Sequence, residues 1–158
     1  ENFKKCMFMA GLPRAKFLEI GSFEGRSCVW LLENILTDDT SKITCIDTFN
    51  GSEEHKEQNL ENLYDIFLHN ISNFKDKVNI IRDKSQDVLK FMKEKYDFIY
   101  IDGLHTYDAV KNDFDKWMEE LNNDPTVFTA SIKHLAYKQL TSDQKATWHN
   151  FLAERGIQ

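Results

Sequence analysis

The chain has 158 residues, 41% of them hydrophobic, a length and composition that fit one domain with a buried core. Its net charge is -6, and its lysines and arginines are mixed among acidic residues, which argues against a nucleic-acid partner. No signal-peptide pattern opens the sequence and no apolar run approaches the roughly 18 residues of a membrane span. Cys6, Cys28 and Cys45 lack CxxC spacing and are interpreted as reduced core thiols. These observations predict a cytoplasmic domain with no membrane segment.

Four short apolar runs predict β-strands. Their hydrophobicity is nearly continuous rather than alternating, which is typical of strands that are covered on both faces of a parallel sheet. The predicted strands are Lys16 to Ile20, Ile43 to Phe49, Val78 to Ile81, and Phe98 to Ile101.

Apolar residues with a 3.6-residue period predict amphipathic helices between and after these strands. A shorter helix is expected to start at Ser85, whose hydroxyl can cap it. Strand and helix alternate four times, which predicts an α/β fold with a doubly wound sheet and ligands at the carboxyl ends of its strands. The helical stripes are Cys28, Leu31, Leu32 and Ile35; Leu60, Leu63, Tyr64, Phe67, Leu68 and Ile71; Val88, Leu89 and Met92; and Val110, Phe114, Trp117 and Leu121.

The last third of the chain has a weaker pattern. Thr126 to Ile132 is compatible with a fifth strand, and Thr141 to Gln144 resembles a capping box that opens a final helix ending at Gly156. No repeat or linker divides the sequence. We therefore expect a single domain over residues 1–158, with its core at 16–121 and an atypical part at 122–158.

The first predicted strand leads into a turn that contains Gly21 and Gly25 and then into a helix. Glycines let the backbone bend sharply and let a ligand approach the main chain, while a helix N-terminus offers free N–H groups to an anion. The Ser27 hydroxyl would add a donor. The alternative is a glycine-containing turn that binds nothing.

Polar residues also follow the next two strands. Asp47, after the second strand, is placed to accept hydrogen bonds from the two hydroxyls of a ribose, although an ordinary turn residue is the alternative. The stretch from Asp83 to Asp87 follows the third strand, and its short polar side chains are candidates for contacts to an adenine edge.

Asp102 and His105 follow the fourth strand, where a transferred group would project. The unperturbed pKa of a histidine is about 6.5, so His105 is a candidate general base near neutral pH. The alternatives are a helix-capping aspartate and an exposed loop histidine.

The segment Leu18 to Ser27 resembles the glycine-loop motif of the catechol O-methyltransferase group, within the class I S-adenosylmethionine-dependent methyltransferases. That motif runs Glu, aliphatic, Gly, small, aromatic, any, Gly, any, Ser. The resemblance implies a Rossmann-like fold with S-adenosylmethionine as cofactor, its carboxylate over the glycine turn and its ribose on Asp47. The cofactor-binding residues so implied are Glu19, Gly21, Ser22, Phe23, Gly25, Ser27, Asp47, Thr48, Asp83, Ser85, Gln86 and Asp102.

The stretch Tyr96 to Val110 is similar to a second branch, which contains small-molecule and macrolide-sugar O-methyltransferases. This similarity implies O-methylation of a small-molecule or sugar hydroxyl, with Asp102 and His105 as catalytic residues and Asp102 as a ligand of Mg²⁺. The sequence departs from the pattern after Ile132, where Lys133 and His134 stand in place of the acidic pair that completes the metal site. The closing strand hairpin of the fold also looks reduced or absent.

Two other functions are alternatives to a methyltransferase. A nicotinamide-dependent dehydrogenase shares the strand, turn and acidic residue, but its GxGxxG fingerprint requires glycines where Phe23 and Arg26 stand. A catalytically silent cofactor-binding or assembly module is the second, suggested by the missing acidic pair. The sequence specifies neither the acceptor molecule nor the oligomeric state.

Overall fold

The structure is a computed structural model of the chain, and it describes residues 9–51, 60–88, 91–92, 94, 96–103 and 130–132. The elements in chain order are β1 (Lys16–Ile20), α1 (Arg26–Asn34), β2 (Lys42–Ile46), α2 (Leu63–Asn70), the 3₁₀ helix η3 (Ser72–Lys77), β3 (Val78–Ile81), α3 (Ser85–Val88), β4 (Phe98–Ile101) and β5 (Ala130–Ile132).

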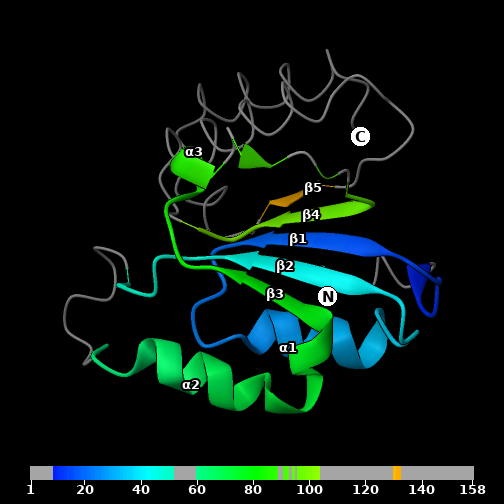
Figure 1. Ribbon diagram of the computed structural model, residues 1–158, viewed down its shortest axis with the longest axis horizontal. Helices are drawn as coiled ribbons and strands as arrows, with labels where there is room; N and C mark the ends of the chain where they lie inside the picture. The colour runs from blue at the N-terminus through cyan, green and yellow to red at the C-terminus, as the bar shows by residue number, and fades with distance from the viewer. Residues whose placement is uncertain are drawn as a thin grey trace, which may run out of the picture.

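The strands form one sheet in the order β3-β2-β1-β4-β5, and all four strand pairings are parallel (Figure 1). The chain builds outward from β1 to β3 on one side and then crosses to β4 and β5 on the other. The winding therefore reverses between β1 and β4. This confirms the predicted doubly wound α/β sheet and identifies the position at which such sheets bind ligands.

Three of the four predicted strands have the predicted limits, and β2 does not. It begins at Lys42 and ends at Ile46, three residues before the predicted end at Phe49. The chain leaves the ladder because the Asp47 carboxylate accepts a hydrogen bond from the Phe49 amide at 2.7 Å, and Phe49 has a left-handed backbone with φ of 55°. An aspartate that binds the backbone two residues ahead favours a turn over a strand.

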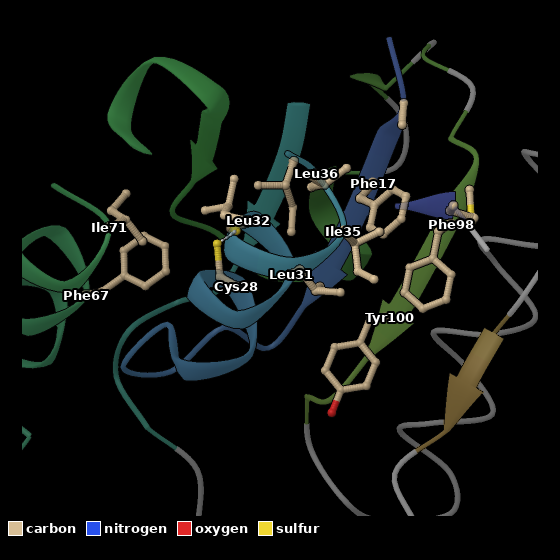
Figure 2. Packing of buried hydrophobic residues seen from close by; sticks show 14 of the residues in the cluster. Phe17, Cys28, Leu31, Leu32, Ile35, Leu36, Phe67, Ile71, Phe98 and Tyr100 are labelled. Carbon is tan, nitrogen blue, oxygen red and sulfur yellow. Dashed lines mark hydrogen bonds between the residues drawn. The ribbon is translucent and has the colours of Figure 1, made fainter. Parts of the chain in front are cut away.

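Helices α1 and α2 cover one face of the sheet (Figure 1). Strand residues in register point to the same face, so Phe17, Ile43 and Phe98 meet the helices together. The rings of Phe17 and Phe98 lie 4.8 Å apart between their centroids. Figure 2 shows these rings beside Leu31 and Ile35 of the α1 region. The α1 stripe predicted from the sequence is thus buried as expected.

Two helix details differ from the sequence prediction. On α2, Leu63, Phe67 and Ile71 are buried, but Leu68 is 38% exposed, so its predicted inward position is wrong. On α3, Val88 is buried and its amide donates to the Lys84 carbonyl, which makes Lys84, not Ser85, the residue that flanks the helix. α3 therefore begins at Ser85, as predicted, and the position that flanks it is Lys84.

β5 confirms the last three residues of the fifth strand suggested by the sequence. The predicted helix with Val110, the predicted final helix between Thr141 and Gly156, and the predicted loss of the closing hairpin all lie outside the described residues. Within the described parts, Cys28 and Cys45 are buried free thiols as predicted. No helix in those same parts is both long and apolar enough to span a membrane.

Candidate functional site

The residues that follow the first four strands come together at the carboxyl edge of the sheet. Backbone hydrogen bonds hold them there: the Gly21 amide donates to Ile46 at 2.8 Å and the Asp102 amide to Ile20 at 2.7 Å. The Asp47 amide donates to the Ile81 carbonyl at 3.2 Å. The structure therefore assembles the glycine turn, Asp47 and Asp102 on neighbouring strand ends, as parallel pairing requires.

Gly21 joins the two halves of this edge by direct backbone contact. Its φ is +86°, and a Cβ placed on it would lie 2.3 Å from the Asp102 carbonyl oxygen and 2.5 Å from the Gly103 Cα. Real Cβ atoms do not approach backbone that closely, so only glycine fits here. The turn after β1 and the chain after β4 are thus in contact without an intervening side chain.

Gly25 ends the turn and precedes α1. Its φ is 83°, its amide donates to the Ser22 carbonyl at 2.8 Å, and a Cβ on it would meet the Phe67 ring at 2.8 Å. The N-terminus of α1 has no side-chain cap and no acidic residue in its first turn. Its first N–H groups and the positive end of its dipole are therefore suited to an anionic group.

The Asp47 carboxylate ties the first turn to the second. Its Oδ2 accepts from the Phe23 amide at 2.8 Å, and its Oδ1 accepts from the Phe49 amide at 2.7 Å. Phe23 itself has a left-handed φ of 50°, which this hydrogen bond helps to hold. Asp47 is therefore a turn residue, which was the alternative interpretation of it in the sequence. Each carboxylate oxygen has a second lone pair, so the predicted contact to ribose hydroxyls remains compatible with this geometry.

Glu19 is fully buried behind the turn. Its Oε1 accepts from the Ser27 hydroxyl at 2.5 Å, and its Oε2 accepts from the Cys45 thiol at 3.5 Å. Desolvation raises the pKa of Glu19 to about 7, against the lowering effect of its hydrogen bonds, that from Ser27 foremost. Because none of its surface is exposed, a ligand would sense Glu19 through Ser27, and the predicted direct contact to a cofactor stays a prediction.

Ser22 contributes a second buried hydroxyl at the turn. It is 3% exposed, and its Oγ has no hydrogen-bond partner in the described structure. It lies near enough to Glu19 to lower the pKa of that carboxyl, although the two side chains do not adopt hydrogen-bond geometry. A buried hydroxyl with an unused donor is costly unless a ligand or water satisfies it.

The structure gives no support to the Mg²⁺ site predicted at Asp102. Among the described residues, three possible metal ligands come together in one place, Glu19, Cys28 and Cys45, and that cluster is buried. Burial raises the pKa of the Cys45 thiol well above its usual value, and Mg²⁺ requires several oxygen ligands. The described residues do not fit this ion. His105, the predicted general base, lies outside the described residues.

Tyr100 is a site residue that the sequence analysis missed. Its hydroxyl donates to Asp102 Oδ2 at 3.0 Å, and burial raises its pKa, so it remains a donor. Tyr100 also pairs in register with Glu19 on β1. Strand alternation could have predicted this contact, because Tyr100 lies two residues before Asp102 and residues two apart on a strand share a face.

The end of β3 is more open. Asp83 is exposed and its carboxylate accepts from the Lys84 amide at 2.7 Å, while Gln86 is exposed on α3. Arg82 stacks over the Tyr64 ring at 4.8 Å and donates to the Thr48 carbonyl at 3.4 Å. The structure thus places the predicted residues Thr48, Asp83, Ser85 and Gln86 around adjacent strand ends.

A sequence profile described as a methyltransferase domain matches residues 18–131. This segment includes the glycine turn and ends within β5, and it covers most of the chain. The chain belongs to this methyltransferase family. The resemblance to methyltransferases seen in the sequence is thereby confirmed. No curated protein matches the sequence.

Solved structures resemble this methyltransferase-family chain in fold at low sequence identity. Cofactor-bound Rv0187 from MTB aligns with a TM-score of 0.63 and 14% identity over 97% of this chain and 65% of its own. The O-methyltransferase TomG from Streptomyces achromogenes, in complex with SAM, gives 0.62 and 18% over 96% and 67%. A cyclopropane-fatty-acyl-phospholipid synthase-like protein from Lactobacillus casei gives 0.51 and 16% over 75% and 43%. The chain thus spans less than two thirds of the length of Rv0187 and of the synthase-like protein.

Proposed function

We propose that this chain is an S-adenosylmethionine-dependent methyltransferase domain that methylates a hydroxyl of a small molecule. The observation that carries the proposal is the juxtaposition of the glycine turn with Asp47. Their link is the hydrogen bond from the Phe23 amide to Asp47 Oδ2 at 2.8 Å. An anion site and a diol acceptor on adjacent strand ends suit an amino-acid nucleoside. The family match supports the activity, and the fold shared with an O-methyltransferase supports the acceptor atom.

The chain's own residues would hold the cofactor as follows. The α1 N-terminus and the Ser27 hydroxyl would receive the methionine carboxylate, and Asp47 would receive the ribose hydroxyls. Asp102, kept in place by the Tyr100 hydroxyl at 3.0 Å, would accept from the ligand's ammonium. When bound, S-adenosylmethionine supplies an electrophilic methyl group on sulfur.

Positioning would provide most of the rate enhancement, because holding the acceptor in line makes the transfer effectively intramolecular. In the proposal, His105 takes the proton from the acceptor hydroxyl, a role typically worth about 10²–10⁴-fold in rate. The proposal contains no Mg²⁺ step, because the described residues do not fit that ion. We also propose that the protein is cytosolic, because Cys28 and Cys45 are free thiols.

Calorimetric titration with S-adenosylhomocysteine, S-adenosylmethionine and NAD tests this proposal. We expect the two adenosyl compounds to bind and NAD not to bind. Asp47→Asn should weaken adenosyl binding by roughly tenfold or more, since hydrogen bonds to charged groups contribute about 1.5–3 kcal/mol. Glu33→Gln, an exposed carboxylate on α1, is the matched control and should bind as the wild type does. Binding of NAD alone would instead support a dehydrogenase.

Transfer of a labelled methyl group from S-adenosylmethionine to a panel of small hydroxyl compounds tests catalysis separately. His105→Ala should reduce turnover by about 10²-fold or more while leaving the affinity for S-adenosylhomocysteine unchanged. Cofactor binding without transfer to any acceptor class would favour the catalytically silent module. Equal turnover of the two proteins would remove His105 from the proposal.

A further inference from the structure

Ser27 stands between the buried Glu19 and the place proposed for the cofactor carboxylate. Glu19 has no exposed surface, whereas Ser27, in the first turn of α1, is partly exposed. The distance from Ser27 Oγ to Glu19 Oε1 is 2.5 Å, which indicates a strong hydrogen bond. A serine hydroxyl has one hydrogen, so Ser27 cannot donate to Glu19 and to a ligand at the same time.

The groups that face Glu19 come from each element packed against it. From the turn comes Ser22, from α1 come Ser27 and Cys28, from β2 comes Cys45, and from β4 and its end come Tyr100 and Asp102. None of these is a cation, and the ion pair found among the described residues joins Lys16 to Glu94 elsewhere. Burial raises the pKa values of the Cys45 thiol and the Tyr100 hydroxyl, so both stay protonated near neutral pH.

The state of Glu19 decides which way Ser27 donates. When Glu19 is ionised it can only accept, so it holds the Ser27 hydrogen and leaves oxygen lone pairs toward a ligand carboxylate. When Glu19 is protonated it donates to Ser27 Oγ, and the Ser27 hydrogen is free for the ligand. Since the pKa of Glu19 is about 7, a modest interaction can shift the balance between the two states.

We propose that a carboxylate-bearing adenosyl ligand binds at the β1–α1 turn together with one proton from solvent, which Glu19 takes up so that Ser27 can donate to the carboxylate. Glu19 is then a positioning residue that acts through Ser27. This inference rests on the proposed function and adds a pH dependence to it: the ligand should bind more tightly as the pH falls toward neutrality. A Glu19 that stays ionised to attract the ligand's ammonium would take up no proton on binding, and its complete burial opposes that arrangement.

The proton count is measured by titrating S-adenosylhomocysteine calorimetrically at about pH 8 in buffers of different ionisation enthalpy. Wild type should take up close to one proton more than Glu19→Gln, and its affinity should fall up to about tenfold per pH unit above the Glu19 pKa. The side-chain amide introduced by Glu19→Gln would donate an N–H to Ser27 at every pH. The affinity of that variant for S-adenosylhomocysteine should therefore depend little on pH over the same range. Because both proteins receive the same ligand, titration of the ligand's own amine cancels in the comparison.

Three controls separate this inference from the proposed function. Methylthioadenosine, which lacks the carboxylate, should bind wild type without the extra proton, and Ser27→Ala should remove the extra proton for S-adenosylhomocysteine. Glu33→Gln should behave as wild type does. Equal proton uptake by wild type and Glu19→Gln, or proton release by wild type, would overturn the inference and leave the proposed function standing. Failure of wild type to bind either adenosyl compound would overturn both.

Discussion

The two ends of the candidate site are built in different ways. At the β1–α1 turn, the position of the chain is set by backbone contact and burial: Gly21 against Asp102, Gly25 against Phe67, and Glu19 buried behind the turn. At the β3–α3 turn, exposed side chains such as Asp83 and Gln86 lie on or beside a single helical turn. The first end should therefore tolerate few substitutions, because stability and binding depend on the same atoms, whereas changes at the second should affect binding with little effect on stability.

Gly21→Ala should give the largest effect on stability. The new Cβ would overlap the Asp102 carbonyl and the Gly103 Cα, and it would require a left-handed backbone in a non-glycine residue. We expect a loss of about 3–5 kcal/mol in the free energy of unfolding, measured by urea denaturation. Gly11→Ala is the matched control, because its φ is also positive, at +73°, but its nearest neighbour is Thr37 Oγ1 at 3.6 Å. That variant should lose about 1–2 kcal/mol. Equal losses would show that backbone contact does not constrain the turn.

Glu19 should make stability fall as the pH rises. Its pKa is about 7 in the folded protein and 4.5 in its ordinary environment, so the folded state binds the proton more tightly. The stabilisation from the protonated carboxyl is complete below pH 4.5 and is lost as the pH rises through 7, a change of about 3 kcal/mol.

Urea denaturation across this range, on wild type and Glu19→Gln, measures this dependence. The variant should lose this component of the pH dependence and should be the more stable protein above pH 7. Parallel curves for the two proteins would show that burial does not hold the carboxyl in its neutral form.

Asp47→Asn should have an intermediate effect. One of the two backbone amides now bound at 2.7 Å and 2.8 Å would face an amide N–H₂ group instead of a carboxylate oxygen. An unsatisfied donor of this kind costs about 1–3 kcal/mol, which urea denaturation would detect. Asp83→Asn is the comparison at the other end of the site. It should change stability by less than about 0.5 kcal/mol, because the carboxylate is exposed. A larger loss for Asp83→Asn than for Asp47→Asn would reverse the contrast between the two ends.

The smallest effect is expected for Arg82→Gln. It removes the cation above the Tyr64 ring at 4.8 Å and the hydrogen bond to the Thr48 carbonyl. At an exposed position the cation–π contact contributes about 0.5–1 kcal/mol. Thermal unfolding of Arg82→Gln and Arg82→Lys should show a slight loss for the first and a smaller one for the second. A loss comparable to that of Gly21→Ala would mean that the open end is also part of the structural core.

The sequence predicted the sheet well because its strands are short, nearly continuous apolar runs that are followed by glycine or polar residues. β1, β3 and β4 were placed with their observed limits. The end of β2 was misplaced because apolar character continues through Phe49, whereas the deciding interaction is the local hydrogen bond from the Phe49 amide to Asp47. Leu68 was assigned inward from periodicity alone, yet the stripe on α2 is narrow and runs through Leu63, Phe67 and Ile71.

The candidate site was predictable in its residues and less so in its contacts. The glycine turn and Asp47 were found from type and spacing. The link from Tyr100 to Asp102, and the row in which Cys45, Glu19 and Tyr100 stand side by side, depend on register between β2, β1 and β4. Register between strands that are distant in the sequence cannot be obtained from one sequence, because alternatives that bury the same residues look equally good.

The central place of β1 has a consequence for the order in which the protein folds. β1 can pair with β2 as soon as both are synthesised, but its other edge must wait for β4, and the Lys16 amide reaches the Asp97 carboxylate across 81 residues of chain. Closing so long a loop is slow compared with local pairing. A nascent chain that ends before β4 would have an unpaired edge on β1, and its Gly21 turn would lack the contact with the Asp102 backbone. The ability to bind a ligand would therefore be among the last properties that the domain acquires.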